Sequence, residues 1–118
     1  MRRPLHATLL SAILAGAVGA PTALSAEGAG AAPDGARQRQ LLRLLKQDCG
    51  SCHGLRLTGG LGPALTPQAL KDKPADSLTA TIMSGRPGTA MPPWRPFLSE
   101  AEAEWLVARM REGTTDAP

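Results

Sequence analysis

Two cysteines and a histidine stand within five consecutive residues of this chain, at Cys49, Cys52 and His53. In a helix, side chains three and four positions apart share one face, so these three groups would point the same way. Two thiols on that face can add to the two vinyl groups of a haem while the imidazole reaches the iron. The spacing C-x-x-C-H is the attachment signal of a c-type haem. We therefore predict one haem c, bound covalently through Cys49 and Cys52, with His53 as an axial ligand.

Two other kinds of site use cysteine pairs. A thiol redox pair of the thioredoxin type follows a strand and opens a helix, whereas this pair follows the leucine-rich stretch 41–45, which has no strand pattern. A structural zinc site needs four ligands, and the chain has only two cysteines and two histidines. One of those histidines, His6, lies in a segment that we expect to be removed. Covalent haem is favoured over both alternatives.

The first 26 residues have the pattern of a secretory signal peptide. Arg2 and Arg3 supply the positive start, and the apolar run 9–20 is too short and too rich in glycine for a membrane span. Cleavage is expected after Ala26; the alternative is after Ala31, where the small residues form a cleaner A-x-A pattern. Export to the periplasm fits the motif, because bacteria attach c-type haem outside the cytoplasm, to an unfolded chain. We expect no stable membrane insertion of the mature chain.

The net charge argues against a nucleic-acid partner. The whole chain has 13 basic and 10 acidic residues, and residues 1–26 hold two of the basic ones and none of the acidic ones. The mature chain therefore has a formal charge of +1, which two haem propionates would bring to about −1. Its basic residues do not alternate with aromatic ones, as a nucleic-acid surface would require. We expect a monomer that meets a redox protein and binds no nucleic acid.

The elements that must position the motif are predicted to be helices. The mature chain has only three aromatic residues, so its own core is small, and a large apolar prosthetic group would complete it. We expect a flexible leader at 27–36, a single domain at 37–112 and a flexible tail at 113–118. Apolar spacing and capping residues predict four helices. The first is 35–49, after an Asp34 cap, and the second is 68–74. The third is 76–84, with Asp76 as its N-cap and Gly85 as its stop, and the fourth is 99–112, with a capping box of Ser99 and Glu102.

Two irregular segments are expected to line the haem. Residues 54–67 contain four glycines and two prolines, which exclude a regular helix. Within them, the carbonyl of Pro63 is our candidate acceptor for the second ring N–H of His53, a bond that would fix the plane of the imidazole. An ordinary turn is the alternative for this segment. Residues 86–97 contain four prolines and Met91.

Met91 is the predicted sixth ligand of the iron. His53 is the only histidine of the mature chain, so two histidines cannot ligate one haem. Met83 and Met110 fall in predicted helices, where core packing explains them, whereas Met91 lies in an extended loop stiffened by Pro92. Met83, or an open or water-bound iron, remains the alternative. Two protein ligands leave no place for a substrate on the iron, so we expect outer-sphere electron transfer and no enzymatic activity.

The order CGSCH, then G-P-x-L at 62–65, then M-P at 91–92, between an N-terminal and a C-terminal helix, resembles the class I monohaem cytochromes c. The resemblance covers about 41–110. It implies a small all-α fold of three to four helices wrapped around the haem, with the terminal helices crossing beside it. The first helix of this chain lacks the aromatic residue that the family places at this crossing.

A closer likeness is to the small periplasmic cytochromes of the NirC type, which are associated with the cytochrome cd-type nitrite reductase. The stretches that carry it are LLKQDCGSCHGLRLTGGLGPALTP and GRPGTAMPPWRPFLSEAEAEWL. This resemblance implies a role in denitrification, with electrons passing from an upstream donor to the nitrite reductase. The alternative that it implies is an accessory factor in the maturation of the d-type haem of that reductase.

Overall fold

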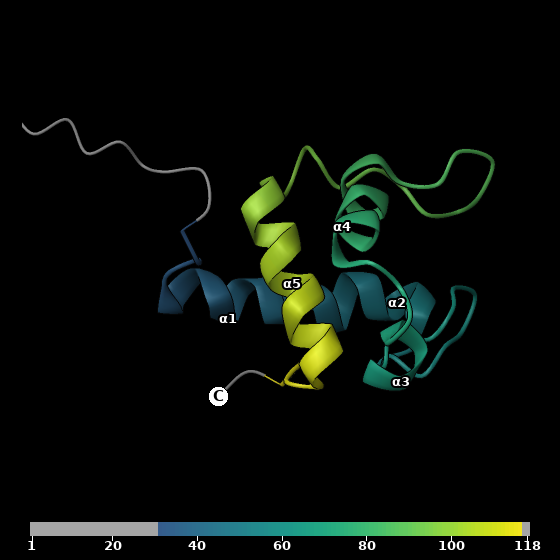
Figure 1. Ribbon diagram of the computed structural model, residues 1–118, viewed down its shortest axis with the longest axis horizontal. Helices are drawn as coiled ribbons and strands as arrows, with labels where there is room; N and C mark the ends of the chain where they lie inside the picture. The colour runs from purple at the N-terminus through teal and green to yellow at the C-terminus, as the bar shows by residue number, and fades with distance from the viewer. Residues whose placement is uncertain (1–30, 117–118) are drawn as a thin grey trace, which may run out of the picture.

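The computed structural model describes residues 31–116, and in this range every regular element is a helix (Figure 1). The absence of strands from 31–116 agrees with the all-α fold predicted from the sequence. The predicted signal peptide at 1–26 lies outside the described residues. None of the helices that the structure describes has the length and apolar character needed to cross a membrane.

The first helical rod is continuous from Gly35 to His53 and has three parts. Its bounds are α1 at Gly35–Leu44, the π-helical turn η1 at Leu45–Cys49 and α2 at Gly50–His53. The carboxylate of Asp34 caps the rod by accepting a 2.8 Å hydrogen bond from the Arg37 N–H, as predicted. The helix was predicted to end at Cys49, but in the structure it continues for four more residues, to His53. Its turn at Leu45–Cys49 is a wider π-helical turn, directly before the residues that include Cys52 and His53.

Three shorter helices follow: α3 at Pro67–Leu70, α4 at Ala75–Ser84 and α5 at Glu100–Glu112. The helix predicted over 68–74 is shorter than expected, because after Leu70 the chain turns, with the Lys73 N–H donating to the Leu70 carbonyl at 3.1 Å, before it reaches Pro74. Asp76 is not the N-cap of α4, so that prediction was wrong. Pro74 precedes α4 without a side-chain cap, and the Asp76 carboxylate instead accepts from the Ser77 N–H at 2.9 Å within the first turn.

The ends of α4 and α5 agree with the sequence. Gly85 terminates α4 with a positive φ of 66°. At α5, the Ser99 hydroxyl accepts from the Glu102 N–H at 3.2 Å, and the Glu102 carboxylate accepts from the Ser99 N–H at 2.8 Å. These two bonds form the predicted capping box, in which two otherwise unpaired N–H groups are satisfied.

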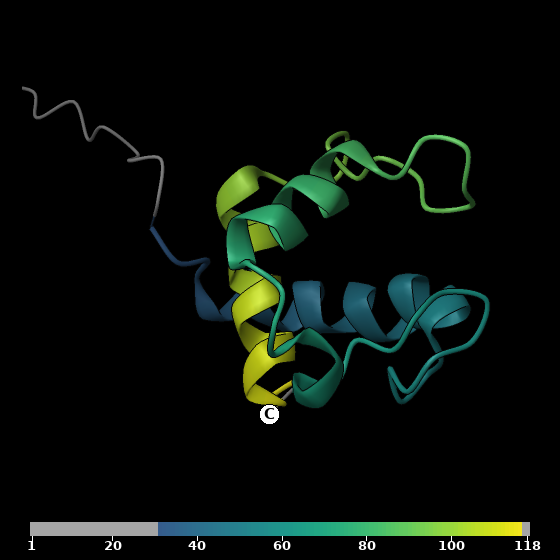
Figure 2. The ribbon, with the colours of Figure 1, turned by 45° about the vertical axis from the view of Figure 1, so that its right-hand side comes forward.

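The core forms where α5 crosses the first rod, with α4 packed against α5 at a steep angle (Figures 1 and 2). Its buried side chains come from the first rod, from α3, α4 and α5, and from two loop residues, Leu57 and Leu98: Leu41, Leu42, Leu45, Leu57, Leu70, Met83, Leu98, Ala103, Leu106, Val107 and Met110. Full burial of one large aliphatic side chain contributes roughly 1.5–3 kcal/mol. Met83 and Met110 belong to this core, in line with the packing role predicted for them.

An ion pair joins the two terminal helices on the surface of this crossing. The Arg37 Nε lies 2.5 Å from Glu102 Oε1, and the two side chains are 37% and 18% exposed. The hydrogen bond from Arg37 is the largest influence on the pKa of Glu102, which it lowers below the usual value for glutamate. Bonds from the Ser99 backbone and hydroxyl lower this pKa further. The pair therefore stabilises the ionised form of Glu102 in the folded protein.

Glu102→Gln should reduce the free energy of unfolding at neutral pH by about 0.5–1 kcal/mol, the range of partly exposed ion pairs. The amide oxygen can still accept from the Ser99 N–H and preserve the cap, while the charge and the hydrogen bond from Arg37 are lost. Because folding lowers the pKa of Glu102, the contribution of the charge is complete above the ordinary pKa of about 4.3. It is lost as the pH falls through the lower pKa of the folded state. Denaturant unfolding followed by circular dichroism should show the two stabilities converging in acid; a constant difference down to about pH 3 would disprove this assignment.

Candidate functional site

The C-x-x-C-H motif lies at the end of the first rod. Cys49 is the last residue of η1, and Cys52 and His53 belong to α2. Both cysteines are half-buried free thiols. Within residues 31–116, no group of three or more histidine, cysteine or acidic side chains is arranged to hold a metal ion, which leaves the zinc alternative without a set of ligands there.

The ring of His53 is oriented by the backbone of the following loop. Its Nδ1 lies 2.6 Å from the carbonyl oxygen of Pro63, which is the acceptor that we proposed from the sequence. A carbonyl can only accept, so Nδ1 must carry the proton, and Nε2 keeps the lone pair that a metal requires. A bond of this kind fixes the ring plane and makes the other nitrogen more basic.

The loop from 54 to 66 folds back onto the end of α2. The Gly59 N–H donates to the carbonyl of His53 at 2.8 Å, and the Gly62 N–H donates to the carbonyl of Cys52 at 2.9 Å. These bonds satisfy helix-terminal carbonyls that would otherwise have no partner. They also bring Pro63 beside the imidazole, so one loop both closes the helix and orients the ring.

Gly62 is a site residue whose own role the sequence analysis missed. A Cβ atom built at Gly62 would lie 2.7 Å from Cε1, 2.8 Å from Nδ1 and 3.1 Å from Nε2 of His53. The backbone therefore touches the ring at a distance that only glycine permits. Its place directly before the proline that holds the ring was the available signal. This glycine cradle and the free thiols fit a histidine-ligated, covalently attached haem.

Gly62→Ala should lower the free energy of unfolding of the mature protein by roughly 1–3 kcal/mol, the usual effect of overpacking. The added methyl group would push the His53 ring away from its bond to Pro63. Gly35→Ala is a matched control, because the only atom near a Cβ there is the tip of Arg39, at 3.8 Å. Thermal unfolding followed by circular dichroism checks the prediction, which fails if both alanine variants melt with the wild type.

Met91 is held by backbone hydrogen bonds at the base of the loop after α4. The Arg86 N–H donates to the Met91 carbonyl at 3.1 Å, and the Met91 N–H donates to the Thr89 hydroxyl at 3.3 Å. A Cβ at Gly85 would lie 2.7 Å from the Met91 carbonyl oxygen, so this close approach also depends on glycine. The half-buried Met91 side chain is thus carried by an ordered backbone outside the core.

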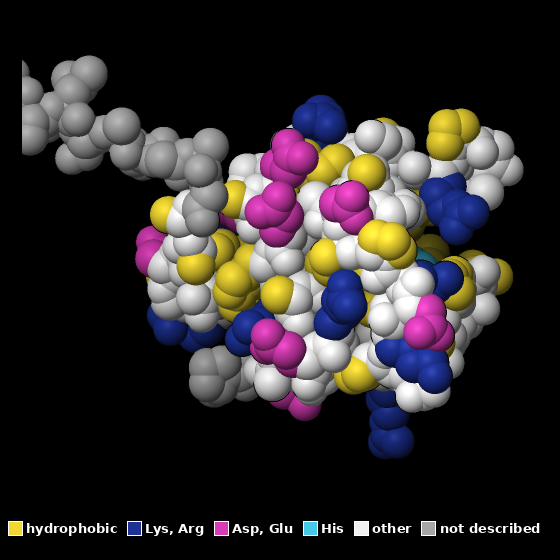
Figure 3. Space-filling model, viewed as in Figure 1, with side chains coloured by type: hydrophobic (Ala, Val, Ile, Leu, Met, Phe, Trp, Pro, Cys, Tyr) yellow, Lys and Arg dark blue, Asp and Glu magenta, His cyan; other side chains and the backbone are white. Residues whose placement is uncertain are grey.

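The loops that carry Pro63 and Met91 extend to the same side of the molecule (Figures 1 and 2). The space-filling view is hollowed between them (Figure 3). Leu61, at the tip of the first loop, is 92% exposed. The structure thus places the end of the C-x-x-C-H helix, its loop and the loop that carries Met91 on one side of the molecule.

Burial affects the chemistry of the first cysteine. It is the main reason that the pKa of the Cys49 thiol rises to about 11, and the charge of Asp48 raises it further. The thiolate is the reactive form of cysteine, so the folded thiol is a weak nucleophile at neutral pH. This environment favours haem attachment before the chain folds.

Comparison with known proteins gives a consistent set of relatives. The family model described as cytochrome C oxidase, cbb3-type, subunit III matches residues 36–110. Cytochrome c55X of Pseudomonas aeruginosa is 68% identical over 81 residues, which cover 69% of this chain and 68% of that protein. A solved structure of the c-type cytochrome NirC is 65% identical with a TM-score of 0.70, and the match covers 73% of this chain and 100% of the other.

A more distant match is to part of a much larger protein. Dihydro-heme d1 dehydrogenase of Pseudomonas aeruginosa is 38% identical over 76 residues, 64% of this chain but only 15% of the dehydrogenase. The structure of dihydro-heme d1 dehydrogenase NirN in complex with DHE matches with 36% identity and a TM-score of 0.54. That match covers 64% of this chain and 16% of the other.

The matched region contains the whole site described above, from η1 to the loop after α4. A c-type cytochrome domain implies a covalently bound haem c, and both relatives of which this chain covers two thirds or more, cytochrome c55X and NirC, are named as cytochromes. The chain belongs to the cytochrome c55X family of small NirC-type c-type cytochromes.

Proposed function

We propose that this chain is a periplasmic carrier of single electrons, with its haem c attached through Cys49 and Cys52 and ligated by His53 and Met91. The observation that supports this most strongly is the 2.6 Å contact between His53 Nδ1 and the Pro63 carbonyl, which prepares Nε2 to bind iron. When bound, haem c supplies reversible one-electron chemistry between ferrous and ferric iron.

The residues of the chain hold and tune this group, and none of them has to carry out a bond-making step. The imidazole and the thioether would occupy both axial positions, which leaves none for a substrate and favours outer-sphere transfer. The Pro63 carbonyl and Gly62 keep the imidazole in place, while Gly85 and Thr89 keep the backbone of Met91 in place. Fixed ligands reduce the structural change between the two redox states.

The proposal includes the maturation of the chain. Residues 1–26 would be removed during export as a signal peptide, leaving a leader at 27–36, a domain at 37–112 and a tail at 113–118. The structure already has α1 beginning at Gly35, and Asp116 pairs with Lys46 at 2.8 Å, so the helical unit and its contacts extend slightly beyond the domain bounds. N-terminal sequencing of the exported protein tests the cleavage site after Ala26.

We propose the cytochrome cd-type nitrite reductase as the electron acceptor, on the strength of the likeness to NirC-type cytochromes. The test is a stopped-flow experiment in which the reduced protein is mixed with the mature reductase. A carrier should be oxidised rapidly, with a rate that saturates as reductase is added. Oxidation no faster than that by free oxidant of the same potential would rule out this acceptor.

Electrostatic steering would act through a local group of cations, because the net charge of the mature chain is near zero. Four exposed cations are candidates: Lys71, Lys73, Arg86 and Arg95. Reversing Arg86 and Arg95 to glutamate should lower the association rate with the reductase about tenfold at low salt and weaken its salt dependence. Arg39→Glu, an exposed reversal on α1, is the control. Equal rates for all three proteins would remove the steering hypothesis.

A second candidate function is an accessory role in maturation of the d-type haem. The specific observation in its favour is the similarity of 64% of this chain to a segment of dihydro-heme d1 dehydrogenase. Deleting the gene and then supplying mature reductase separates the two functions. A carrier remains necessary under these conditions, whereas a maturation factor becomes dispensable.

A further inference from the structure

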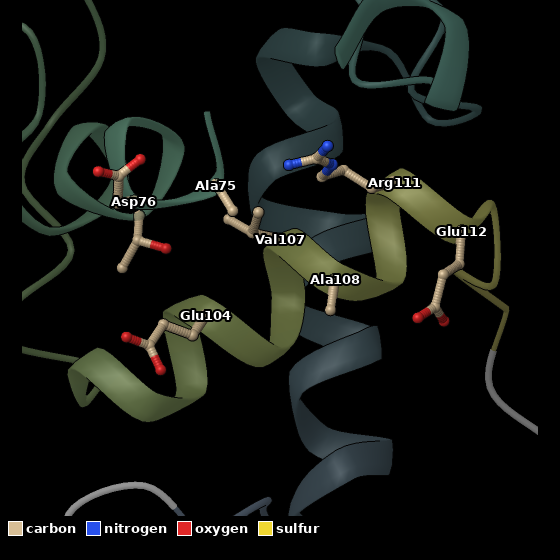
Figure 4. A pocket seen from close by; sticks show the side chains of 8 residues that line it. Ala75, Asp76, Glu104, Val107, Ala108, Arg111 and Glu112 are labelled. Atoms are coloured by element: carbon tan, nitrogen blue, oxygen red, sulfur yellow. The ribbon is translucent and has the colours of Figure 1, made fainter. Parts of the chain in front are cut away.

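A groove separate from the haem-binding residues lies between α4 and α5 (Figure 4). The groove is open to solvent and has a volume of about 520 Å³. Its middle is apolar, formed by Ala75 from α4 and by Val107 and Ala108 from α5. The groove therefore belongs to a part of the surface that the proposed electron-transfer site leaves unused.

A buried hydroxyl group in this groove has no partner. Thr79 lines the groove and is only 4% exposed, and its Oγ1 makes no hydrogen bond with any residue that the structure describes. Buried polar groups are normally paired, because leaving one unpaired opposes folding. The oxygen has a free acceptor position, which a donor in the groove reaches once the side chains that shield it from solvent move aside.

The groove is lined by more acidic than basic side chains, and two of the acidic ones form no ion pair among the described residues. Asp76 on α4 and Glu104 on α5 lie at one end, and Arg111 and Glu112 lie at the other (Figure 4). The ion pairs among residues 31–116 involve neither Asp76 nor Glu104. Arg111 is occupied with the carbonyl of Lys73, at 3.3 Å. The end with two carboxylates is therefore suited to a cation.

We propose that this groove binds an alkylammonium group. The ammonium would lie between the carboxylates of Asp76 and Glu104 and donate to Thr79 Oγ1, so its three donors meet three acceptors. Its alkyl stem would lie on Val107 and Ala108. The same chemistry is found in the lysine side chain of a partner protein and in a free diamine. Since the groove is separate from the haem-binding residues, such a ligand would leave the electron-transfer side free.

The test is a titration of the ¹⁵N-labelled, haem-loaded protein, followed by NMR. Butylammonium should shift amides of α4 and α5 around the groove in a saturable way, and butanol, which has the same stem without the charge, should not. Thr79→Val and Glu104→Gln should each weaken binding about tenfold, as expected for a lost hydrogen bond to a charged group. Glu100→Gln, at the start of α5 and outside the groove, should bind as the wild type does.

Three results would overturn the proposal: no saturable shift, equal shifts with butanol, or equal weakening in Glu100→Gln. Thr79→Val should remain folded, because it exchanges an unpaired buried hydroxyl for a methyl group of similar size, and its melting temperature is measured alongside. Two further ligands separate the sources of the group. Tighter binding of 1,5-diaminopentane than of Nα-acetyl-lysine methylamide indicates a free diamine, and the reverse order indicates a lysine of a partner protein.

Discussion

Met91→Leu is expected to lower the reduction potential of the haem-loaded protein by a few hundred millivolts, within the roughly 0.8 V that axial ligands span. Leucine preserves the volume of the side chain but has no sulfur to donate to iron. A thioether favours the reduced iron more than water or a harder donor does, so its loss lowers the potential. A redox titration followed by absorbance measures this shift.

Met83→Leu is the matched control for this experiment, because it makes the same exchange in the buried core. Its potential should stay near that of the wild type, and the exchange conserves volume, so its stability should change by less than about 1.5 kcal/mol. A large shift in Met83→Leu together with none in Met91→Leu would assign the sixth ligand to the alternative methionine.

Cys52→Ala is expected to eliminate most of the holoprotein formed in the periplasm. The remaining Cys49 can form only one of the two thioethers, and a thioether resists the acid–acetone extraction that removes non-covalent haem. The alkaline pyridine spectrum of any residual product should show one unsaturated vinyl group. In the double variant Cys49→Ala/Cys52→Ala, all bound haem should be extractable.

Ser51→Ala is the control in the same helical turn. Ser51 is exposed, and its hydroxyl donates only to the Asp48 carbonyl, at 2.6 Å, apart from a long contact with the Cys52 sulfur. Its yield and pyridine spectrum should equal those of the wild type. If Cys52→Ala accumulates to wild-type levels with two saturated haem side chains, the assignment of Cys52 as an attachment residue is wrong.

Local sequence signals predicted much of the fold. The Leu41–Leu45 stripe marks the face of the first rod that packs on α5, and short-range chemistry specifies the caps at Asp34 and Ser99. The G-P-x-L pattern also led to the carbonyl of Pro63, because a histidine ligand needs a partner for its second nitrogen and because the pattern resembles that of the class I cytochromes c.

Features that depend on tertiary packing were beyond the sequence. The π-helical turn η1 has no distinct periodic pattern over five residues, and π turns of this kind occur frequently at functional sites. For Gly62, the sequence offered only its position before Pro63, and the contact of its backbone with the ring of His53, nine positions earlier, comes from the structure. The groove of Thr79 and Glu104 exists only because α4 and α5 pack side by side. The residues of this groove come from two helices that no short stretch of sequence contains together.

The most direct test of the central claim, that His53 and Met91 fill both axial positions of a carrier haem, is the absorbance spectrum of the reduced protein before and after addition of carbon monoxide. We predict a low-spin spectrum that carbon monoxide leaves unchanged in the wild type and alters in Met91→Leu. A wild-type protein that is high-spin, or that forms a carbon monoxide complex on mixing, would contradict the claim and would show an open site of the kind that haem enzymes use.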